Sequence, residues 1–486
     1  MKFARNLIIF AALSFAPLHA DAHQATGFKI GEVTTDSAII WTRITKNVEP
    51  NSYKDGIMPT FVAADGSELT PDGFKRPKKK VDPKEIRWPE GKGFEDIRYG
   101  APGAEGETRV LYRTEDGSDD WSETAWGAVD PKADFIRQIL IDGLEPSTVY
   151  EMKVQTRSAT AGSTLEGGFK TAPAADDEDS KVVFTVSTGQ AFWDQDIEDF
   201  GFQIYPTMLA KTRPDFFVHT GDIVYYDSHA KSVDLANWHW QRTYSRPTNV
   251  DFHRQVPSYF IKDDHDTLTN DCWSTMKPKM GSFTWDDGIR IFKDQTPQRE
   301  KTYRTFRWGK DLQIWLVEGR DFRSPNPDPD GPDKTIWGAE QMAWLKKTVA
   351  ESDATFRILF SPTPIVGPDR GGKQDNHSNS NFQHEGKLVR EFLASQERMV
   401  VVCGDRHWQY HSIDPVTKLR EYSCGPASNE HAGGWSQSDY REDFHQFLRV
   451  QGGYLSGTVE RIDAKPRLTF QFHSVHGKVA FESVVE

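Results

Sequence analysis

The sequence predicts an α/β protein with an added β unit: an N-terminal β-sandwich, then a larger domain in which two sheets pack between layers of helices. Short runs of alternating apolar and polar residues fill the first part of the chain, as half-buried strands require. Continuous apolar runs separated by helix-period segments follow, which is typical of α/β folds. Further alternating runs near the end predict a second sheet and therefore an α/β/β/α sandwich.

Size and composition indicate a globular protein with two domains. The chain has 486 residues, of which 37% are hydrophobic and 12% aromatic, and domains usually hold about 100 to 200 residues. The net charge of -13 argues against a nucleic-acid platform or a basic surface for anionic membranes. The basic run 75–80 is local and broken by Pro77, so we interpret it as a solvated loop without a function.

The three cysteines, Cys272, Cys403 and Cys424, exclude a disulfide framework and an all-cysteine zinc site. At most one bridge can form among them. Cys403 ends an apolar run, which favours a place in the core. The sequence does not decide whether Cys403 and Cys424 form a disulfide bond.

The amino terminus has the three regions of a signal peptide, which we place at residues 1–22. Lys2 and Arg5 precede an apolar run over residues 7–17, and small residues follow at 20–22. The run is shorter than the ~20 apolar residues of a membrane-spanning helix, and no later stretch approaches that length. We therefore expect export to the periplasm or the extracellular space, without a transmembrane anchor in the mature chain. The alternative is a buried first helix.

Residues 23–173 are predicted to form the β-sandwich. Alternating runs at 38–43 and 149–154 are its clearest strands. An insertion at about 48–134, rich in Gly, Pro and charge, is expected to cap one end of the sandwich or to reach toward the next domain. The segments 144–150 and 168–173 resemble a fibronectin type III or immunoglobulin-like module. The acidic stretch 174–180 is predicted to be a linker.

Residues 181–486 are predicted to form the second domain. Its expected strands are 182–186, 215–219, 259–261, 312–317, 357–360 and 399–403, with later strands at 458–462 and 468–472. Its clearest helices are expected at 204–211, 339–350 and 387–395.

Polar clusters follow three of these apolar runs directly. They read Gly-Asp-Ile-Val-Tyr at 221–225, Asp-Asp-His-Asp at 263–266 and Gly-Asp-Arg-His at 404–407. Ligands of open α/β sheets bind beyond the carboxyl ends of the strands, so these clusters are expected to meet. The crowded carboxylates at 263–266 repel one another unless a cation or several donors neutralise them. Carboxylates with a few imidazoles suit iron, calcium, magnesium or manganese, so a site for two metal ions is predicted.

These clusters also carry a family resemblance over nearly the whole mature chain. Together with segment 31–43, Arg-Asp-Phe-Arg at 320–323 and Gly-Ala-Glu-Gln at 338–341, they resemble the PhoD-like (alkaline phosphatase D) metallophosphoesterase family. Its members have an N-terminal β-sandwich before a calcineurin-like catalytic domain. The resemblance implies hydrolysis of a small-molecule phosphate ester, monoester or diester, by water activated on two metal ions.

The resemblance also implies ligands for both ions. Asp222 would bridge them, and Tyr225 and His407 would complete the first site, which often holds ferric iron in this family. Asp264 and Asp405 would bind the second ion, commonly calcium. Zinc, manganese or magnesium are alternatives.

The resemblance implies a catalytic role for His265, which would contact the phosphate and protonate the leaving oxygen. Arg320 or Arg406 would hold the non-bridging oxygens, although either is equally compatible with a structural ion pair. Two polar loops, 375–381 and 429–435, are candidates for the substrate pocket or for flexible surface loops. The substrate-binding candidates from these loops are Asn381, Asn429 and His431.

The sequence departs from the family pattern at Gly189, where the family usually has a cysteine that ligates iron. The first metal site is therefore expected to be atypical. Gln190, Asp194 and Asp196 are candidate replacements from the same loop, and the sequence does not choose among them. Two alternatives to a phosphoesterase remain: a non-catalytic binding relative with a degraded metal site, and a hydrolase of a related ester such as a phospholipid head group.

Overall fold

The computed structural model describes residues 22–76, 80–117, 120–159, 161–227 and 229–486. The predicted signal peptide therefore lies outside the described residues, except for Ala22, which is buried in a small cluster with Ile44 and Val129. Within the described ranges, no helix has both the length and the apolar character of a membrane span.

The N-terminal unit is a sandwich of two sheets. One face is formed by β1 (Phe28–Gly31), β2 (Ser37–Arg43) and β9 (Ile136–Asp142), and the other is a five-stranded sheet. The alternation along β10 explains its place, because Tyr150, Met152 and Val154 are buried in the sandwich core. The strands of the five-stranded sheet are β6 (Glu107–Thr114), β7 (Ser122–Glu123), β8 (Gly127–Ala128), β10 (Val149–Arg157) and β11 (Gly162–Lys170).

The insertion is shorter than the predicted range 48–134. Strands β6, β7 and β8 fall inside that range, but β6 pairs with β10 and belongs to the sandwich. The alternation of β6 is weak in the sequence, because polar Thr108 and Thr114 share the inward face with Val110 while apolar Leu111 lies on the outward face. The remaining insertion forms its own small sheet of β3 (Thr60–Ala63), β4 (Glu68–Leu69) and β5 (Pro83–Arg87).

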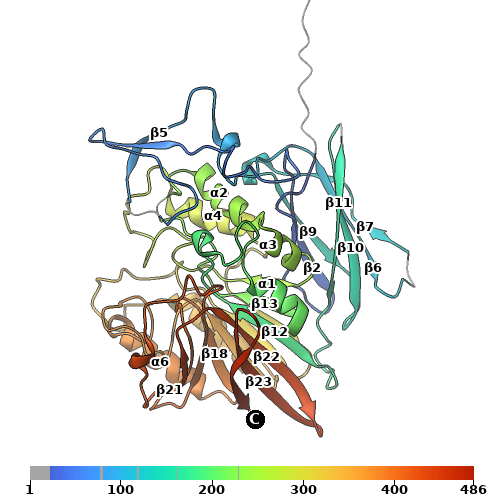
Figure 1. Cartoon of the computed structure of the whole chain (residues 1–486). Helices are drawn as coiled ribbons and strands as arrows, with labels where there is room; N and C mark the ends of the chain where they lie inside the picture. Colours follow the sequence, from blue (N-terminus) through green and yellow to red (C-terminus); the bar gives the residue numbers. More distant parts are fainter. Residues whose placement is uncertain (1–21, 77–79, 118–119, 160, 228) are drawn as a thin grey trace, which may run out of the picture.

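The insertion packs on the second domain. Figure 1 shows β5 beside α2 (Val233–Tyr244) and α4 (Trp285–Gln295), away from β10 and β11. Phe61 and Ile97 of the insertion share an apolar cluster with Leu235 and Trp238 of α2. The insertion thus reaches toward the second domain, which was one of the two placements expected from the sequence.

The second domain is the expected α/β/β/α sandwich, built on two sheets. Strands β12 (Val182–Ser187), β13 (Phe216–His219) and β14 (Ser258–Phe260) run parallel, and β22 (Gly453–Ile462), β23 (Lys465–Ser474) and β24 (Val479–Val485) extend that sheet. The second sheet contains β15 (Arg304–Trp308), β16 (Leu312–Leu316), β17 (Phe356–Ser361), β18 (Met399–Cys403), β19 (Gln409–Ile413), β20 (Arg420–Cys424) and β21 (His445–Arg449).

The main core lies between the two sheets. Phe184 and Phe216 of the first sheet share an apolar cluster with Ile358 and Phe360 of the second. Helices α5 (Gly338–Ala350) and α6 (Gln383–Ala394) cover the outer face of the second sheet through a separate cluster. The other helices are α1 (Ile204–Thr207) and α3 (Pro247–His253), and the short 3-10 or π turns are Phe94–Asp96, Pro131–Ala133, Phe192–Asp194, Met208–Thr212, Ser380–Phe382 and Gln437–Asp439.

The cysteines contribute to packing. All three lie in the described part of the chain and are buried free thiols. The Cys424 thiol donates to the carbonyl oxygen of Cys403 at 3.5 Å, so these two residues are neighbours without a bridge.

The two domains share one continuous nine-stranded sheet. Strand β1 pairs in parallel with β14 at Gly31 and Ser258, which joins the sandwich strands to the strands of the second domain. The predicted linker 174–180 has neither helix nor strand, but it is fixed in place by ion pairs of Glu178 with Lys310 and Arg461.

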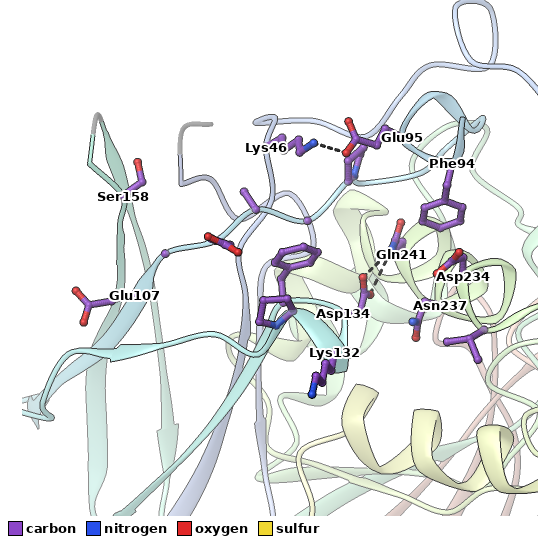
Figure 2. A pocket seen from close by; sticks show the side chains of 18 of the residues that line it. Lys46, Phe94, Glu95, Glu107, Lys132, Asp134, Ser158, Asp234, Asn237 and Gln241 are labelled. Carbon is purple, nitrogen blue, oxygen red and sulfur yellow. Dashed lines mark hydrogen bonds and ion pairs between the residues drawn. The ribbon is translucent and has the colours of Figure 1, made fainter. Parts of the chain in front are cut away.

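A buried ion pair of the sandwich accepts hydrogen bonds from the second domain, which gives the domains a second point of contact. The Arg43 guanidinium contacts Asp134 at 2.8 Å, and the amides of Gln241 in α2 and Gln295 in α4 each donate to the same carboxylate at 3.0 Å. A cavity of about 910 Å³ opens beside Asp134 and Gln241 (Figure 2). Among the described residues, its lining includes none of the predicted site residues.

We expect Arg43→Met to lower the free energy of unfolding by about 3–5 kcal/mol, because it leaves the Asp134 carboxylate buried without its cation. Urea unfolding followed by tryptophan fluorescence measures the change. The matched control is Arg87→Met, which removes an exposed pair with Glu68 and should cost about 0–1 kcal/mol. Equal losses in the two variants would contradict this role of Arg43.

Candidate active site

Four strand ends bring the predicted clusters together. The loops after β12, β13 and β14 come from the first sheet, and the loop after β18 comes from the second. Gly221 lets the loops after β13 and β14 lie close together, because a Cβ at this position would be 2.6 Å from Cβ of Asp263. Its φ of +102° also disfavours any other residue there. Asp266 ties the same loops by accepting hydrogen bonds from the backbone amides of Ile223 and Asp263 at 3.0 and 2.6 Å.

Asp222, Tyr225 and His407 form one group of converging side chains. The Tyr225 hydroxyl donates to Oδ2 of Asp222 at 3.1 Å and lies 3.4 Å from Nε2 of His407. That nitrogen is 3.2 Å from the same Asp222 oxygen. His431 joins the group, with its Nε2 2.5 Å from the Tyr225 hydroxyl.

The chemistry of this group fits a cation. Asp222 is 1% exposed, and its Oδ1 has no hydrogen-bond partner among the residues that the structure describes. Burial raises the pKa of Asp222 to about 7, so a neighbouring positive charge would stabilise its ionised form. Burial also lowers the pKa of His407 and of His431 to about 3, which leaves both imidazoles neutral, as metal ligation requires.

Asp264 and Asp405 lie in a region that is already rich in cations. Asp222, Asp264 and His265 each offer a possible ligand atom within 4.8 Å of one another. Burial alone would raise the pKa of Asp264, but the nearby His265 and Arg320 lower it below its ordinary value. Burial raises the pKa of Asp405 to about 7, although its carboxylate pairs with the guanidinium of Arg406.

His265 is oriented by a chain of charged groups. Its Nδ1 contacts Oδ2 of Asp227, and the other oxygen of Asp227 accepts from the Lys80 ammonium at 2.7 Å. Burial would lower the pKa of His265, but the carboxylates of Asp227 and Asp264 raise it well above its ordinary value. His265 also lines the cavity described next, where a protonated imidazole can donate a proton.

The group lies on the wall of a cavity of about 600 Å³. Its lining includes the predicted site residues Asp222, Tyr225, His265, Asp405, His407 and His431. Four cationic side chains also line it: Arg76, Lys80, Arg370 and Lys373. The first two belong to the basic run at 75–80; both are exposed, as a solvated loop requires, and they also border the cavity. In the sequence, only the expectation that the insertion extends toward the next domain indicated that Arg76 and Lys80 would contact the cavity.

Arg320 and Arg406 do not contact the cavity, which corrects their prediction as phosphate-holding residues. Both are 0% exposed. Arg320 donates to Oδ1 of Asp263 at 2.7 Å, and Arg406 pairs with Asp369 as well as with Asp405. Their charge is used to neutralise buried carboxylates behind the site, which is the alternative that the sequence left open.

Asn381 and Asn429 are also absent from the cavity lining. The Asn381 amide donates to the carbonyl oxygen of Asn326 at 2.9 Å, and Asn429 accepts from the backbone amide of Gly452 at 3.1 Å. Each therefore connects its loop to another segment of the chain, and the prediction that they bind substrate is not supported by their positions. His431 does reach the site, but it lies against Tyr225 and His407.

Comparisons with known proteins agree with this architecture. A family model described as PhoD-like phosphatase matches residues 184–442. Alkaline phosphatase D of Bacillus subtilis (strain 168) is 23% identical over 372 residues, which cover 63% of this chain and 60% of that relative, less than two thirds of its length. A solved structure of PhoD has a TM-score of 0.69 over 97% of this chain and 90% of its own, at 16% identity, and supports the fold.

The fold is a β-sandwich followed by an α/β/β/α sandwich, as in the solved structure of PhoD. Since the family model matches more than half of the sequence, the chain belongs to the PhoD-like phosphatase family.

We expect Arg320→Met to destabilise the fold by about 3–5 kcal/mol, because Asp263 and Asp264 lose the buried cation that they share. Thermal and urea unfolding measure this loss. Arg370→Met is the control, since that side chain is 38% exposed at the cavity and its removal should change the free energy of unfolding by about 0.5 kcal/mol or less. An Arg320→Met variant as stable as the wild type would contradict this role of Arg320.

Proposed function

We propose that this chain is an exported hydrolase of phosphate esters that works with two bound metal ions. One observation carries the proposal: Oδ1 of Asp222, buried and without a partner among the described residues, lies in a group with a phenol and an imidazole on the wall of a cationic cavity. A buried carboxylate oxygen in such a position needs a cation.

The residues divide the work between the two ions. Asp222, Tyr225 and His407 would hold the first, and Asp264 and Asp405 would hold the second with Asp222. When bound, the pair of ions would supply charge neutralisation and activation of water for an in-line displacement. Iron is our proposal for the phenol and imidazole ligands and calcium for the carboxylates, with zinc, manganese and magnesium as alternatives.

The rest of the cavity would bind and protonate the substrate. His265, held by Asp227, would give its proton to the leaving oxygen. Arg370 and Lys373 would attract the phosphate, and the rings of Trp193 and Trp408 offer an apolar wall for the ester group. These groups suit a small ester of either kind, so the preference between monoester and diester is a matter for the assay.

Metal removal tests the proposal directly. Protein purified without added metal should hold about one or more tightly bound ions per chain, and chelation should abolish hydrolysis of aryl phosphate monoesters and diesters. Elemental analysis measures the first, and a rate assay with added iron, calcium, zinc or manganese measures recovery. Protein that binds no ion and gains no activity with any of them would be the non-catalytic relative instead.

His265→Ala separates proton donation from the other steps. We expect the rate to fall about 100- to 10,000-fold for an alkyl phosphate, whose leaving group needs the proton, and much less for an activated aryl phosphate. The measurement is kcat with both substrates at saturating concentration. His384→Ala, at an exposed histidine, is the control and should leave both rates unchanged. Equal losses with the two substrates would reject His265 as the acid.

A further inference from the structure

Gly189 leaves a space beside the group formed by Asp222, Tyr225 and His407. It follows β12 with a φ of +47°. A Cβ at this position would lie 3.0 Å from Cδ2 of His431 and 3.3 Å from Nε2 of His407. Such contacts are tighter than ordinary van der Waals packing, so a side chain at position 189 would compete with the imidazole of His431 for the same space.

His431 fills that space with a fixed orientation. Its Nδ1 contacts Oδ2 of Asp194 at 2.7 Å, while its Nε2 lies 2.5 Å from the Tyr225 hydroxyl. The ring centroids of His431 and His407 are 4.1 Å apart. A carboxylate behind one nitrogen of an imidazole is the usual arrangement for a histidine whose other nitrogen binds a metal.

The other residues of the Gly189 loop do not offer a ligand. The side-chain oxygen of Gln190 accepts from Tyr205 at 2.7 Å, and Asp196 accepts from the backbone amide of Gln203 at 2.7 Å. Neither lines the cavity among the described residues. Asp194 does line it, but its carboxylate is engaged by His431. Of the three replacements that the sequence left open, only Asp194 lines the cavity, and it contacts His431.

The distances among Asp222, Tyr225 and His407 match those between ligands of one ion, and His431 reaches these three through the Tyr225 hydroxyl. The three distances are 3.1, 3.2 and 3.4 Å. Donors at about 2.0–2.1 Å from a metal ion are about 2.9–3.4 Å from their neighbours. The shorter contact of Tyr225 with His431 is a hydrogen bond that a bound cation would replace.

We propose that His431, oriented by Asp194, is a protein ligand of the first metal ion, in the space that Gly189 leaves open. The inference rests on the proposed function and defines its atypical first site. The ligands are one carboxylate, one phenol oxygen and two imidazoles. None of the three cysteines lines the cavity among the described residues, so the site has no thiolate. Imidazole ligands of this kind suit iron, zinc, copper or nickel.

Metal affinity of the full-length chain tests this inference, with Zn²⁺ and Co²⁺ as probes in competition with a chromogenic chelator. We expect His431→Ala to lower the affinity for the more tightly bound ion by more than tenfold. Asp194→Asn, which keeps the ligand but loosens its orientation, should weaken it by about 10- to 100-fold. His411→Ala is the control, because this buried imidazole stacks on Tyr422, and it should leave the affinity within threefold.

A count of coordinated imidazoles gives a second measurement. In the Cu²⁺-loaded protein, nitrogen hyperfine couplings from pulsed EPR should show two imidazoles in the wild type and one in His431→Ala. Asp194→Asn should keep both, which separates a ligand from a residue that only shapes the loop. A single imidazole in the wild type, or unchanged affinity in His431→Ala, would overturn the inference.

The outcomes separate this inference from the proposed function. A chain that binds metal through His431 but hydrolyses no phosphate ester would support the ligand and reject the activity. A chain that hydrolyses phosphate esters, and whose His431→Ala variant keeps its metal affinity, would support the activity and reject His431 as a ligand. A wild-type chain without any bound ion would reject both.

Discussion

The burial of several aspartates at one edge of the sheets is the constraint on which the rest of the site depends. An ionised carboxylate without a partner is very costly away from water. Asp263 is neutralised by Arg320, Asp405 by Arg406, and Asp266 by backbone amides. Asp222 alone among these keeps an oxygen without any such partner in the described structure while also facing the cavity. Arginines and backbone amides thus offset much of this negative charge, and Asp222 keeps an oxygen at the cavity that is open to a cation.

The basic residues divide into two groups with different work. The buried arginines stabilise the carboxylates from behind, whereas the other basic residues line the cavity, where Lys80 and Lys373 also pair with carboxylates. Lys80 belongs to the second group and comes from the N-terminal insertion, where it contacts the carboxylate that holds His265. The insertion is therefore part of the geometry of the site, although the chemistry-bearing clusters all come from the other domain.

Local patterns were enough to predict the fold class and the meeting of the strand-end clusters. The apolar run that ends before Asp222 and the run that ends before Asp405 are strands, and their ends do meet. The direction of a side chain could not be predicted, because a sequence does not tell whether Arg320 faces a ligand or another carboxylate. The role of His431 depended on a vacancy at Gly189, more than 200 positions away, which only the folded chain brings beside it. Contacts of that kind have no local signal.

The pairing of Gly31 with Ser258 has a consequence for solubility. Without β1, strand β14 would be the outermost strand of its sheet, with a row of backbone groups open to pairing with another chain. Such open edges are templates for aggregation, and β14 is the strand that leads into the Asp263–Asp266 cluster. The sandwich therefore covers a sheet edge as well as supplying an insertion. Without the first domain, the second domain would expose this edge and could associate with copies of itself.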